Sequence, residues 1–450
     1  MKVLLIHPPS NLKETPVPLI GLGYIASYLE KEHHKVKIID SLALKYTFED
    51  VLRDFKKFDP DIVGLTAFTI HLEIALSLAR HIKKINPNCI VVLGGSHPTV
   101  RAKETLKENP EIDIIVRNEG ELTFLELVNK LEKQQDLSYV KGINFRKNKK
   151  IVNNPDRKPI NLDDLPMPAF HLLPMEKYAS GQDDIRMNDR IFGIRLFGKQ
   201  GQTAGLISTS RGCPFNCVFC AAWKVMGDKW RGRSAENVFD ELKLLKDKYK
   251  LRVIDFADDT FSLDKKRTEK ICNLIKKEDL DILWSCSTRV DLFDKKTASL
   301  FKETGCYRVT FGLESGNQKT LDFFRKGITL EDSIRAVKIT KEFKLQANSN
   351  FIIGVPGETR SDILNTINFA RKLKLAFNTF SILTPYPGTQ IYEYAKKHDL
   401  LLSNDWTKYH PGNSILKTGL TNRELRGFLI KANVLCNIGK SNISKILKKM

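Results

Sequence analysis

Short apolar runs alternate with longer amphipathic stretches over the first third of the chain. Runs rich in Val, Ile and Leu, typical of strands buried on both faces, occupy residues 2–6, 36–40, 61–66, 90–95 and 113–116. Stretches with helical spacing stand between and after them, at residues 17–31, 48–57, 71–86 and 121–133. Because strands that alternate with helices build parallel sheets with right-handed crossovers, the pattern predicts a Rossmann-like, doubly wound α/β domain over residues 1–140.

A second alternation of the same kind starts near residue 205. Six strands are predicted, the first around Leu206 and the others at residues 253–257, 283–287, 308–312, 347–354 and 379–383. Six repeats are fewer than the eight that close a full barrel, so the pattern predicts a partial (β/α)6 barrel over residues 205–390. Residues 391–450 are expected to form a mainly helical segment on the substrate side.

The periodicity is lost between these two regions. Residues 162–170 are punctuated by two prolines and show no clear period, which is typical of a stretch that crosses a domain boundary. We therefore predict a linker or bridge over residues 141–204.

The composition is that of a soluble globular protein, with 42% hydrophobic and 28% charged residues in a chain of 450. No apolar run approaches the roughly 20 residues that a membrane span needs. The apolar start of the chain is shorter than the core of a signal peptide and fits a buried strand better. These features predict a cytoplasmic protein.

The net charge of +20 leaves two interpretations open. It could serve an anionic substrate, or it could reflect a lysine-rich composition without a dedicated partner. No lysine run alternates with aromatic residues, so a nucleic-acid partner is disfavoured. The tail over residues 431–450 has five lysines and no acid, which suits either a plain surface helix or peripheral contact with an anionic membrane.

Three cysteines follow the first strand of the second alternation: Cys213, Cys217 and Cys220, with three and then two residues between them. Three thiolates can hold three irons of a [4Fe-4S] cluster and leave the fourth iron open, as a catalytic site requires. A structural zinc site or a ferredoxin-like cluster would need a fourth ligand nearby, whereas the next cysteine is Cys272. The alternative that is not an enzyme is an iron–sulfur electron-transfer or binding module.

The spacing of these cysteines after a strand resembles the radical S-adenosylmethionine (radical SAM) superfamily. The N-terminal domain resembles the cobalamin-binding domain that precedes many radical SAM cores. Its Gly-Gly-Ser-His-Pro-Thr at residues 94–99 follows the fourth strand, and its Gly-Glu at residues 120–121 precedes the last helix. The motif Asp-x-His-x-x-Gly, which supplies an axial histidine in many cobalamin proteins, is absent. The resemblance therefore implies that this chain is similar to the class B radical SAM methyltransferases. It also implies that the chain binds cobalamin base-off, without a histidine ligand.

Polar groups at the predicted strand ends suit the parts of SAM. A carboxylate can bind the amine or the ribose, an arginine the carboxylate, and a bare backbone edge the adenine. Arg308 and Asn350 are further candidates for polar contacts, and the sequence does not determine which face of the sheet they lie on. The predicted SAM contacts are Asp258, Asp259, Arg289, Glu314, Gly354 and Gly357, and the predicted cobalamin contacts are Thr66, Gly94, Gly95 and His97.

The resemblance also implies an activity. The three cysteines hold the cluster, the reduced cluster cleaves SAM to a 5′-deoxyadenosyl radical, and methylcobalamin methylates an unactivated carbon of a small-molecule or lipid-like substrate. An external donor such as flavodoxin or ferredoxin would supply the electron. The alternative within the family is a cyclase or rearrangement enzyme that does not methylate. Methylthiotransferases are disfavoured because their N-terminal domain carries three more cluster cysteines, whereas here Cys89 alone precedes Cys213.

Overall fold

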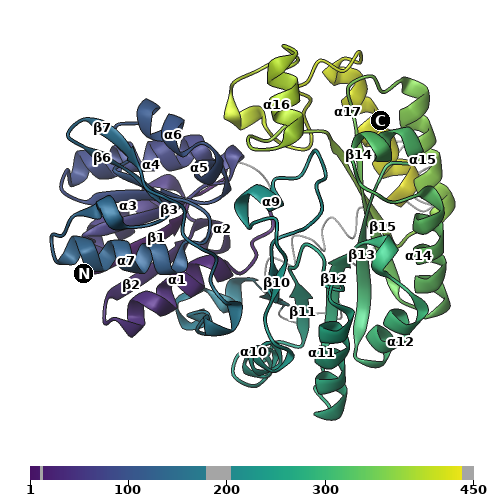
Figure 1. The fold of residues 1–450 in the computed structure, drawn as a ribbon, viewed down its shortest axis with the longest axis horizontal. Coiled ribbons are helices and arrows are strands. Elements are labelled where there is room, and N and C mark those ends of the chain that lie inside the picture. The colour runs from purple at the N-terminus through teal and green to yellow at the C-terminus, as the bar shows by residue number, and fades with distance from the viewer. Residues whose placement is uncertain (11–13, 179–203, 438–450) are drawn as a thin grey trace. The chain divides into compact units, whose positions relative to one another are not determined.

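The computed structural model describes residues 1–10, 14–178 and 204–437 (Figure 1). Among these residues, unit 1 holds residues 1–178, 224–227 and 405–407, and unit 2 holds the others. The predicted bridge and the basic tail lie partly outside the described ranges, and the predicted domain boundaries stay predictions. In the described part of the chain, no helix is long and apolar enough to cross a membrane.

Unit 1 is built on a seven-stranded sheet with the order β2-β1-β3-β4-β5-β6-β7. The first five strands of this order are parallel, and β6 and β7 form an antiparallel edge. The predicted doubly wound parallel sheet is therefore confirmed. The bounds are β1 Lys2–His7, β2 Lys35–Asp40, β3 Ile62–Thr66, β4 Ile90–Gly94, β5 Ile114–Val116, β6 Ile143–Lys147 and β7 Lys150–Asn153.

Helices cover both faces of this sheet (Figure 1). Leu4 and Val63 share one hydrophobic core with Phe55 of α3, on the face that α4 and α6 also cover. On the opposite face, a methyl group on Gly64 would lie 3.2 Å from the ring of Phe124, which belongs to α7. The bounds are α1 Ile20–Lys31, α2 Ser41–Leu44, α3 Phe48–Phe58, α4 Leu72–Ile85, α5 Ser96–Val100, α6 Ala102–Glu108 and α7 Glu121–Glu132.

The pair β6–β7 differs from the sequence pattern, which predicted no strand after residue 116 in this unit. Asn148 and Lys149 join the two strands with φ values of 50° and 64°. Two successive residues with positive φ form the tight turn that matches the twist of a hairpin. The hairpin lacks the glycine that usually marks such a turn, and its strands carry lysine and asparagine at the edge of the sheet, so no apolar run indicated them.

Unit 2 is built on a six-stranded sheet with the order β15-β14-β13-β12-β11-β8, in which every neighbouring pair is parallel. Within the described residues β8 and β15 remain its two edges, which confirms the predicted open arrangement of six strands. A separate antiparallel pair is formed by β9 Ser210–Arg211 and β10 Arg231–Gly232. The bounds are β8 Ala204–Ile207, β11 Val253–Phe256, β12 Leu283–Thr288, β13 Cys306–Glu314, β14 Gln346–Ile353 and β15 Phe377–Ile382.

An aromatic cluster joins the sheet of unit 2 to its helices. Trp284 of β12 is fully buried and packs against Phe256, Phe261 and Phe301, and Phe301 belongs to α12. Helices α11, α12 and α14 line this face (Figure 1). The bounds in unit 2 are α10 Ala235–Asp247, α11 Lys265–Lys277, α12 Lys295–Glu303, α13 Gln318–Phe323, α14 Leu330–Glu342, α15 Arg360–Leu373, α16 Gln390–Lys397 and α17 Asn422–Asn437. The short helix α9 Ala222–Val225 begins in unit 2 and ends among the residues assigned to unit 1.

Side-chain caps determine where several helices of unit 2 begin. Each cap accepts a hydrogen bond from a backbone amide of the first helical turn, which satisfies one of the amides left without a helical partner. The segments that lead into these caps carry the candidate site. The capping residues are Ser234, Asp264, Asp294, Thr329 and Thr359.

Candidate active site

The three cysteines predicted to bind a cluster lie on one loop of unit 2, between β9 and α9. Cys217 is buried, whereas Cys213 and Cys220 are partly buried. The amide of Cys220 donates to the carbonyl oxygen of Cys217 over 3.1 Å, and the amide of Ala222 donates to the sulfur of Cys220 over 3.4 Å. The loop therefore turns back on itself while it presents the three thiols.

Backbone hydrogen bonds and apolar packing anchor this cysteine loop. The amide of Val218 donates to the carbonyl oxygen of Phe324 over 3.1 Å, and the carbonyl oxygen of Val218 accepts from the amide of Ile391 over 2.9 Å. The ring of Phe219 packs edge-on against Phe324, with 4.9 Å between their centres. Val218, Phe324 and Ile391 belong to one buried hydrophobic cluster. The loop is thus held in place by segments that are far from it in sequence.

Burial raises the pKa of all three thiols, and that of Cys220 to about 11. The charge of Asp259 adds to this rise at Cys213 and Cys220, whereas the charges of Lys326 and Arg289 oppose it at Cys217. The charges of Cys213 and Cys217 add to the rise at Cys220. Thiols with a raised pKa are protonated at neutral pH, and metal binding displaces those protons.

The cysteine loop fits an iron–sulfur cluster better than a single metal ion. Among the described residues, no three His, Cys, Asp or Glu side chains converge closely enough to hold one ion. In a cluster each thiolate binds a different iron, so the ligands stand further apart than they do around one ion. Three thiolates also leave one iron open for a small molecule to chelate.

The two aspartates after β11 have different surroundings. Asp258 is 3% exposed, and its carboxylate accepts hydrogen bonds from the amide and hydroxyl of Thr209, at 3.1 and 3.0 Å, and from the hydroxyl of Ser210. Asp259 is exposed, and its charge acts on two of the thiols. Asp258 therefore ties the segment before the cysteine loop to β11, while Asp259 is the carboxylate near the thiols. The SAM contacts of both residues stay predictions.

Arg289, predicted to bind the SAM carboxylate, already makes several contacts within the protein. Its Nε and Nη2 donate to the two oxygens of Asp291 over 3.0 and 2.9 Å, and Nη2 also donates to the carbonyl oxygen of Lys326 over 2.8 Å. The guanidinium carbon lies 3.7 Å from the centre of the Phe215 ring in the cysteine loop. Arg289 thus connects the cysteine loop to the segment around Lys326, and its contact with SAM stays a prediction.

Glu314, at the end of β13, has a backbone conformation that is uncommon for a residue with a side chain. Its φ is 62°, and the pairing of β13 with β14 changes register between Gly312 and Glu314. The buried carboxylate accepts a hydrogen bond from Nζ of Lys326 over 2.9 Å. Backbone strain of this kind costs of order 1–3 kcal/mol and is concentrated at functional sites.

In the loop after β14, some backbone groups bond to the protein and others border open space. Gly354 and Gly357 have φ values of 79° and 81°. Oε2 of Glu358 accepts the amides of Gly354 and Val355 over 2.7 and 3.1 Å. Burial raises the pKa of Glu358 to about 7, against the effect of these two amides, which favour the charged form. A side chain on Gly357 would meet nothing within 4 Å, so the space for a ligand along this predicted adenine edge lies beside Gly357.

A row of polar side chains crosses the sheet of unit 2 on the face away from Trp284. Asp255 is paired with Ser285 in register, and Ser285 with Arg308. The hydroxyl of Ser285 donates to Asp255 over 2.6 Å and accepts from Nη2 of Arg308 over 3.0 Å. Arg308 therefore shares a face with Asp255, which the sequence left undetermined. Linked polar groups on the inner face of a partial barrel can orient a polar substrate.

The predicted cobalamin contacts of unit 1 lie in two neighbouring loops at the carboxyl edge of the sheet, after β3 and β4. The amide of Ala67 donates to the carbonyl oxygen of Gly94 over 2.9 Å, and the amide of His97 donates to that of Ala67 over 3.3 Å. Gly95 has a φ of 104°, and a methyl group there would lie 2.7 Å from the oxygen of Ala67 and 3.0 Å from the hydroxyl of Thr66. Glycine alone fits at this position, so the close approach of the two loops depends on Gly95.

The side chain of His97 is packed under this edge. It is 1% exposed, and its Nδ1 lies 3.1 Å from the hydroxyl oxygen of Thr69. Burial, together with the charge of Arg101, lowers the pKa of His97 to about 4, so the ring is neutral at neutral pH. Phe68, in the loop after β3, is 55% exposed. An edge of backbone groups, hydroxyls and one apolar ring fits a large, planar ligand such as a corrin, and the contact of His97 with it stays a prediction.

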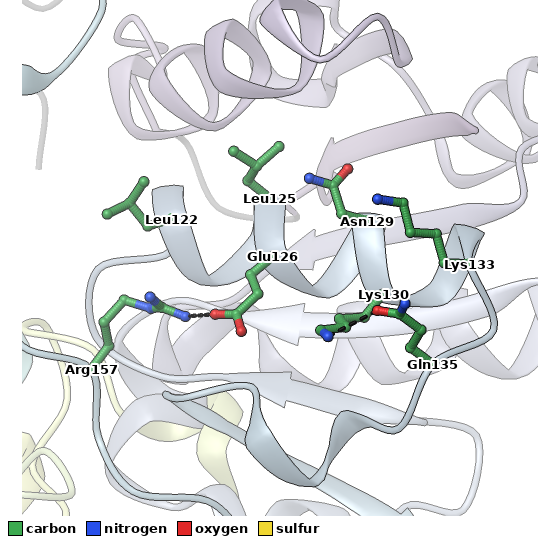
Figure 2. A pocket seen from close by; sticks show the side chains of 8 residues that line it. All are labelled: Leu122, Leu125, Glu126, Asn129, Lys130, Lys133, Gln135 and Arg157. Carbon is green, nitrogen blue, oxygen red and sulfur yellow. Dashed lines mark hydrogen bonds and ion pairs between the residues drawn. The ribbon is translucent and has the colours of Figure 1, made fainter.

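A pocket of about 370 Å³ on α7 is separate from this edge (Figure 2). Figure 2 shows that Arg157 reaches Glu126 and that Lys130 reaches Gln135. The charged groups of the pocket are thus largely paired with one another, and the pocket follows a helix rather than the strand ends where ligands of such sheets bind. It is therefore not a candidate cofactor site. Its lining residues are Leu122, Leu125, Glu126, Asn129, Lys130, Lys133, Gln135 and Arg157.

Comparison with known families agrees with this division of the chain. Residues 207–370 match the radical SAM superfamily, and residues 14–128 match the B12 binding domain. The first range contains the cysteine loop and the strands from β11 to β14, and the second contains the edge formed after β3 and β4.

Individual relatives extend over nearly the whole chain. An uncharacterized methyltransferase of Pyrococcus horikoshii is 44% identical over 96% of this chain and 92% of its own length. The anaerobic magnesium-protoporphyrin IX monomethyl ester cyclase of Rubrivivax gelatinosus is 30% identical over 94% of this chain and 75% of its own length. The solved structure of the radical SAM methyltransferase TsrM from Kitasatospora setae, with cobalamin and a [4Fe-4S] cluster bound, shares the fold. Its TM-score is 0.77 at 16% identity, over 98% of this chain and 89% of that chain.

These findings define the class of the protein as an enzyme in which a B12 binding domain precedes a radical SAM domain. The chain belongs to the radical SAM superfamily. The resemblance found in the sequence is thereby confirmed, and a [4Fe-4S] cluster, SAM and cobalamin are the cofactors of this class.

Three residues of the site were not identified from the sequence: Phe215 within the cysteine loop, and Asp291 and Lys326 outside it. Phe215 stacks on Arg289, Asp291 holds Arg289, and Lys326 pairs with Glu314. Phe215 lies between Cys213 and Cys217 in the cysteine motif, whereas Asp291 and Lys326 belong to no motif with a known spacing. The one local signal is Gly327, whose φ of 67° marks a sharp turn directly after Lys326.

Proposed function

We propose that this protein is a cobalamin-dependent radical SAM methyltransferase that acts on an unactivated carbon of a small molecule. The observation that carries the proposal is the loop with Cys213, Cys217 and Cys220 in a parallel-sheet unit, in one chain with a B12 binding domain. A relative that is 44% identical over nearly the whole chain is named a methyltransferase, which supports methyl transfer as the outcome.

The residues of the chain would position the reactants. When bound, the cluster supplies one electron to SAM, and cobalamin supplies a transferable methyl group. The three thiolates would hold the cluster, and Asp259, whose charge reaches Cys213 and Cys220, would accept the amine of SAM. The open space beside Gly357 would admit the adenine. The apolar packing of Phe219 on Phe324 would keep water away from the cluster.

The substrate would lie over the polar row of Asp255, Ser285 and Arg308. The row combines the carboxyl group of Asp255 with the guanidinium of Arg308, which suits a substrate with a strongly polar group. We expect an external electron donor such as flavodoxin or ferredoxin. All eight cysteines are free thiols, which fits a reducing compartment such as the cytoplasm.

Anaerobic reconstitution tests the proposal. The full chain is loaded with iron, sulfide and hydroxocobalamin, and SAM and dithionite are then added. We expect 5′-deoxyadenosine to form and base-off cobalamin to be bound in a ratio of one per chain. Cys217→Ala should reduce 5′-deoxyadenosine by more than about 100-fold, because the loss of a ligand exceeds the effect of losing an outer partner.

Cys436→Ala is the matched control for this substitution. Cys436 is a partly buried free thiol on α17, away from the cysteine loop in sequence, and its replacement should leave the cluster absorbance and 5′-deoxyadenosine unchanged. Cleavage of SAM without bound cobalamin would contradict the assignment of unit 1. A complete cluster that cleaves no SAM with any reductant, in the presence of its substrate, would favour an electron-transfer protein instead.

A second candidate function is a radical cyclisation or rearrangement without methyl transfer. The relative that is 30% identical and named a cyclase favours it. The mass of the product separates the two candidates, because methyl transfer alone adds a CH2 unit to the substrate.

A further inference from the structure

The buried ion pair of Lys326 and Glu314 in unit 2 carries a large desolvation cost. Both side chains are about nine-tenths buried, at 11% and 7% exposed, and their charged atoms are 2.9 Å apart. Removing two charges from water is costly, and their attraction offsets that cost only where the geometry is excellent and the remaining polar groups have partners. An apolar pair of similar volume would stabilise the fold about as well. A function other than stability therefore accounts for the pair better.

The contacts of Lys326 hold its segment against the cysteine loop. The carbonyl oxygen of Phe324 accepts the amide of Val218, and the carbonyl oxygen of Lys326 accepts Nη2 of Arg289. Arg289 in turn stacks on a ring of the loop. Nζ of Lys326 lies 6.0 Å from the centre of the Phe219 ring, next to Cys220 in the chain. The ammonium group is thus buried beside the loop that presents the thiols.

The backbone of β13 makes the space for this ion pair. A methyl group on Gly312 would collide with Oε1 of Glu314 and would lie 2.7 Å from Nζ of Lys326. The change of register after Gly312 and the φ of 62° at Glu314 bring the carboxylate to the ammonium group. The absence of a side chain at Gly312 and the strained backbone of Glu314 therefore both allow the ion pair with Lys326.

Lys326 keeps its charge in this buried position. Burial lowers the pKa of Lys326, but the attraction of nearby negative groups, above all Glu314 at 2.9 Å, outweighs burial and raises it above its usual value. The lysine is therefore charged at neutral pH, and its ammonium group lies 6.0 Å from the ring of Phe219 in the cysteine loop.

We propose that Lys326 sets the reduction potential of the cluster, with Glu314 as the counter-charge that positions it. This inference rests on the proposed function, because it requires a cluster on the three cysteines. Reduction adds one negative charge to a cluster. A buried cation near a thiolate ligand favours the reduced state, and a buried anion disfavours it, since the low dielectric of the interior screens neither. Lys326 acts in this way through its charge beside the cysteine loop, 6.0 Å from the ring of Phe219, and not as a ligand of the cluster.

A redox titration of the reconstituted full chain, followed by the EPR signal of the reduced cluster in the absence of SAM, tests the proposal. Lys326→Met should shift the one-electron equilibrium at least tenfold toward the oxidised cluster, which corresponds to a potential lower by about 59 mV. Glu314→Gln should shift it in the opposite direction. Lys326→Arg, which keeps the charge, should stay close to the unmodified protein.

Two further variants separate charge from structure. The double variant Lys326→Met with Glu314→Gln removes both charges and should return toward the original potential. Lys319→Met is the matched control on α13. The side chain of Lys319 is 64% exposed and pairs with Asp362, so its loss should leave the potential unchanged.

Opposite shifts in the two single variants would support the proposal, since a disturbed cysteine loop would shift both in the same direction. Equal potentials for Lys326→Met and the unmodified protein, or shifts of the same sign, would overturn it. If Lys326→Met fails to retain a cluster, Glu314→Gln decides alone, because it leaves the ammonium group in place. An unmodified protein without any reduced-cluster signal would contradict the proposed function itself, and the inference would fall with it.

Discussion

The carboxyl edges of the two parallel sheets have the same architecture and carry different chemistry. The edge of unit 1 is shaped by backbone hydrogen bonds around Gly95, and its histidine, His97, is neutral and buried. The edge of unit 2 carries three thiols together with the buried charges of Arg289, Glu314 and Lys326. In both units a strand leads into a loop and then a helix, so the loops alone decide which ligand each edge can bind.

The two edges differ in the energetic cost of their local structure. In unit 1 the closeness of two loops excludes any side chain at Gly95, so the cost of a change is backbone strain. In unit 2 buried charges need partners, and an aromatic core below them keeps the sheet and helices together. Substitutions in the two units should therefore act through different energies and with different pH dependence.

The largest expected effect is in the core of unit 2. Trp284→Ala should lower the free energy of unfolding by about 3–5 kcal/mol, because it leaves a cavity among three aromatic rings. Leu283→Ala, on the same strand but 41% exposed, should cost far less. Urea unfolding followed by circular dichroism measures both. Equal losses would show that the aromatic cluster does not hold this unit together.

The next effect depends on pH and also belongs to unit 2. Glu358 has a pKa of about 7 in the folded protein, raised by burial from 4.5. The folded state therefore holds this proton more tightly, and the resulting stability is complete below pH 4.5 and is lost as the pH rises through about 7. The loss amounts to about 3 kcal/mol at most.

Unfolding measured between pH 4.5 and 8 checks this dependence against Glu358→Gln. The amide oxygen of glutamine can still accept the backbone amides of Gly354 and Val355, but it does not titrate. The variant should therefore lack this part of the pH dependence. An identical pH profile in both proteins would mean that Glu358 is not the group responsible.

In unit 1 the same substitution should have opposite signs at two glycines. Gly95→Ala should destabilise the unit by about 1–3 kcal/mol, because the φ of 104° and the closeness of Ala67 leave no space for a side chain. Gly21→Ala, in α1 with nothing within 4 Å, should stabilise it by about 0.5 kcal/mol. Thermal unfolding of the two variants measures both changes. A neutral Gly95→Ala would remove the argument that the close approach of the two loops depends on Gly95.

The smallest expected effect concerns the pocket on α7. Lys133→Ala removes an exposed charge from its rim and should change the free energy of unfolding by less than about 0.5 kcal/mol. Cobalamin bound per chain, measured by absorbance, should also stay the same. Reduced cobalamin binding in this variant would move the ligand site from the strand ends to the helix.

The strands and helices with a strong pattern were predictable from the sequence. Strands such as β1 and β4 are continuous runs of Val, Leu and Ile because both faces of a parallel sheet are buried. The hairpin β6–β7 was not predictable in the same way. It lies at an edge, exposes lysine and asparagine, and turns through Asn148 and Lys149 without a glycine.

The candidate site also has a part that was predictable from the sequence and a part that was not. By itself, the sequence determined the cysteine loop, the order of the strand ends and the family, because the three thiols that can hold a cluster stand within a few residues of one another and leave a local pattern. Only the tertiary structure decided that Asp258 is enclosed by Thr209 and Ser210, and that Lys326 and Glu314 lie beside the thiols. These contacts join segments that are distant in the chain, and burial gives each charge its partner only after the sheet has formed.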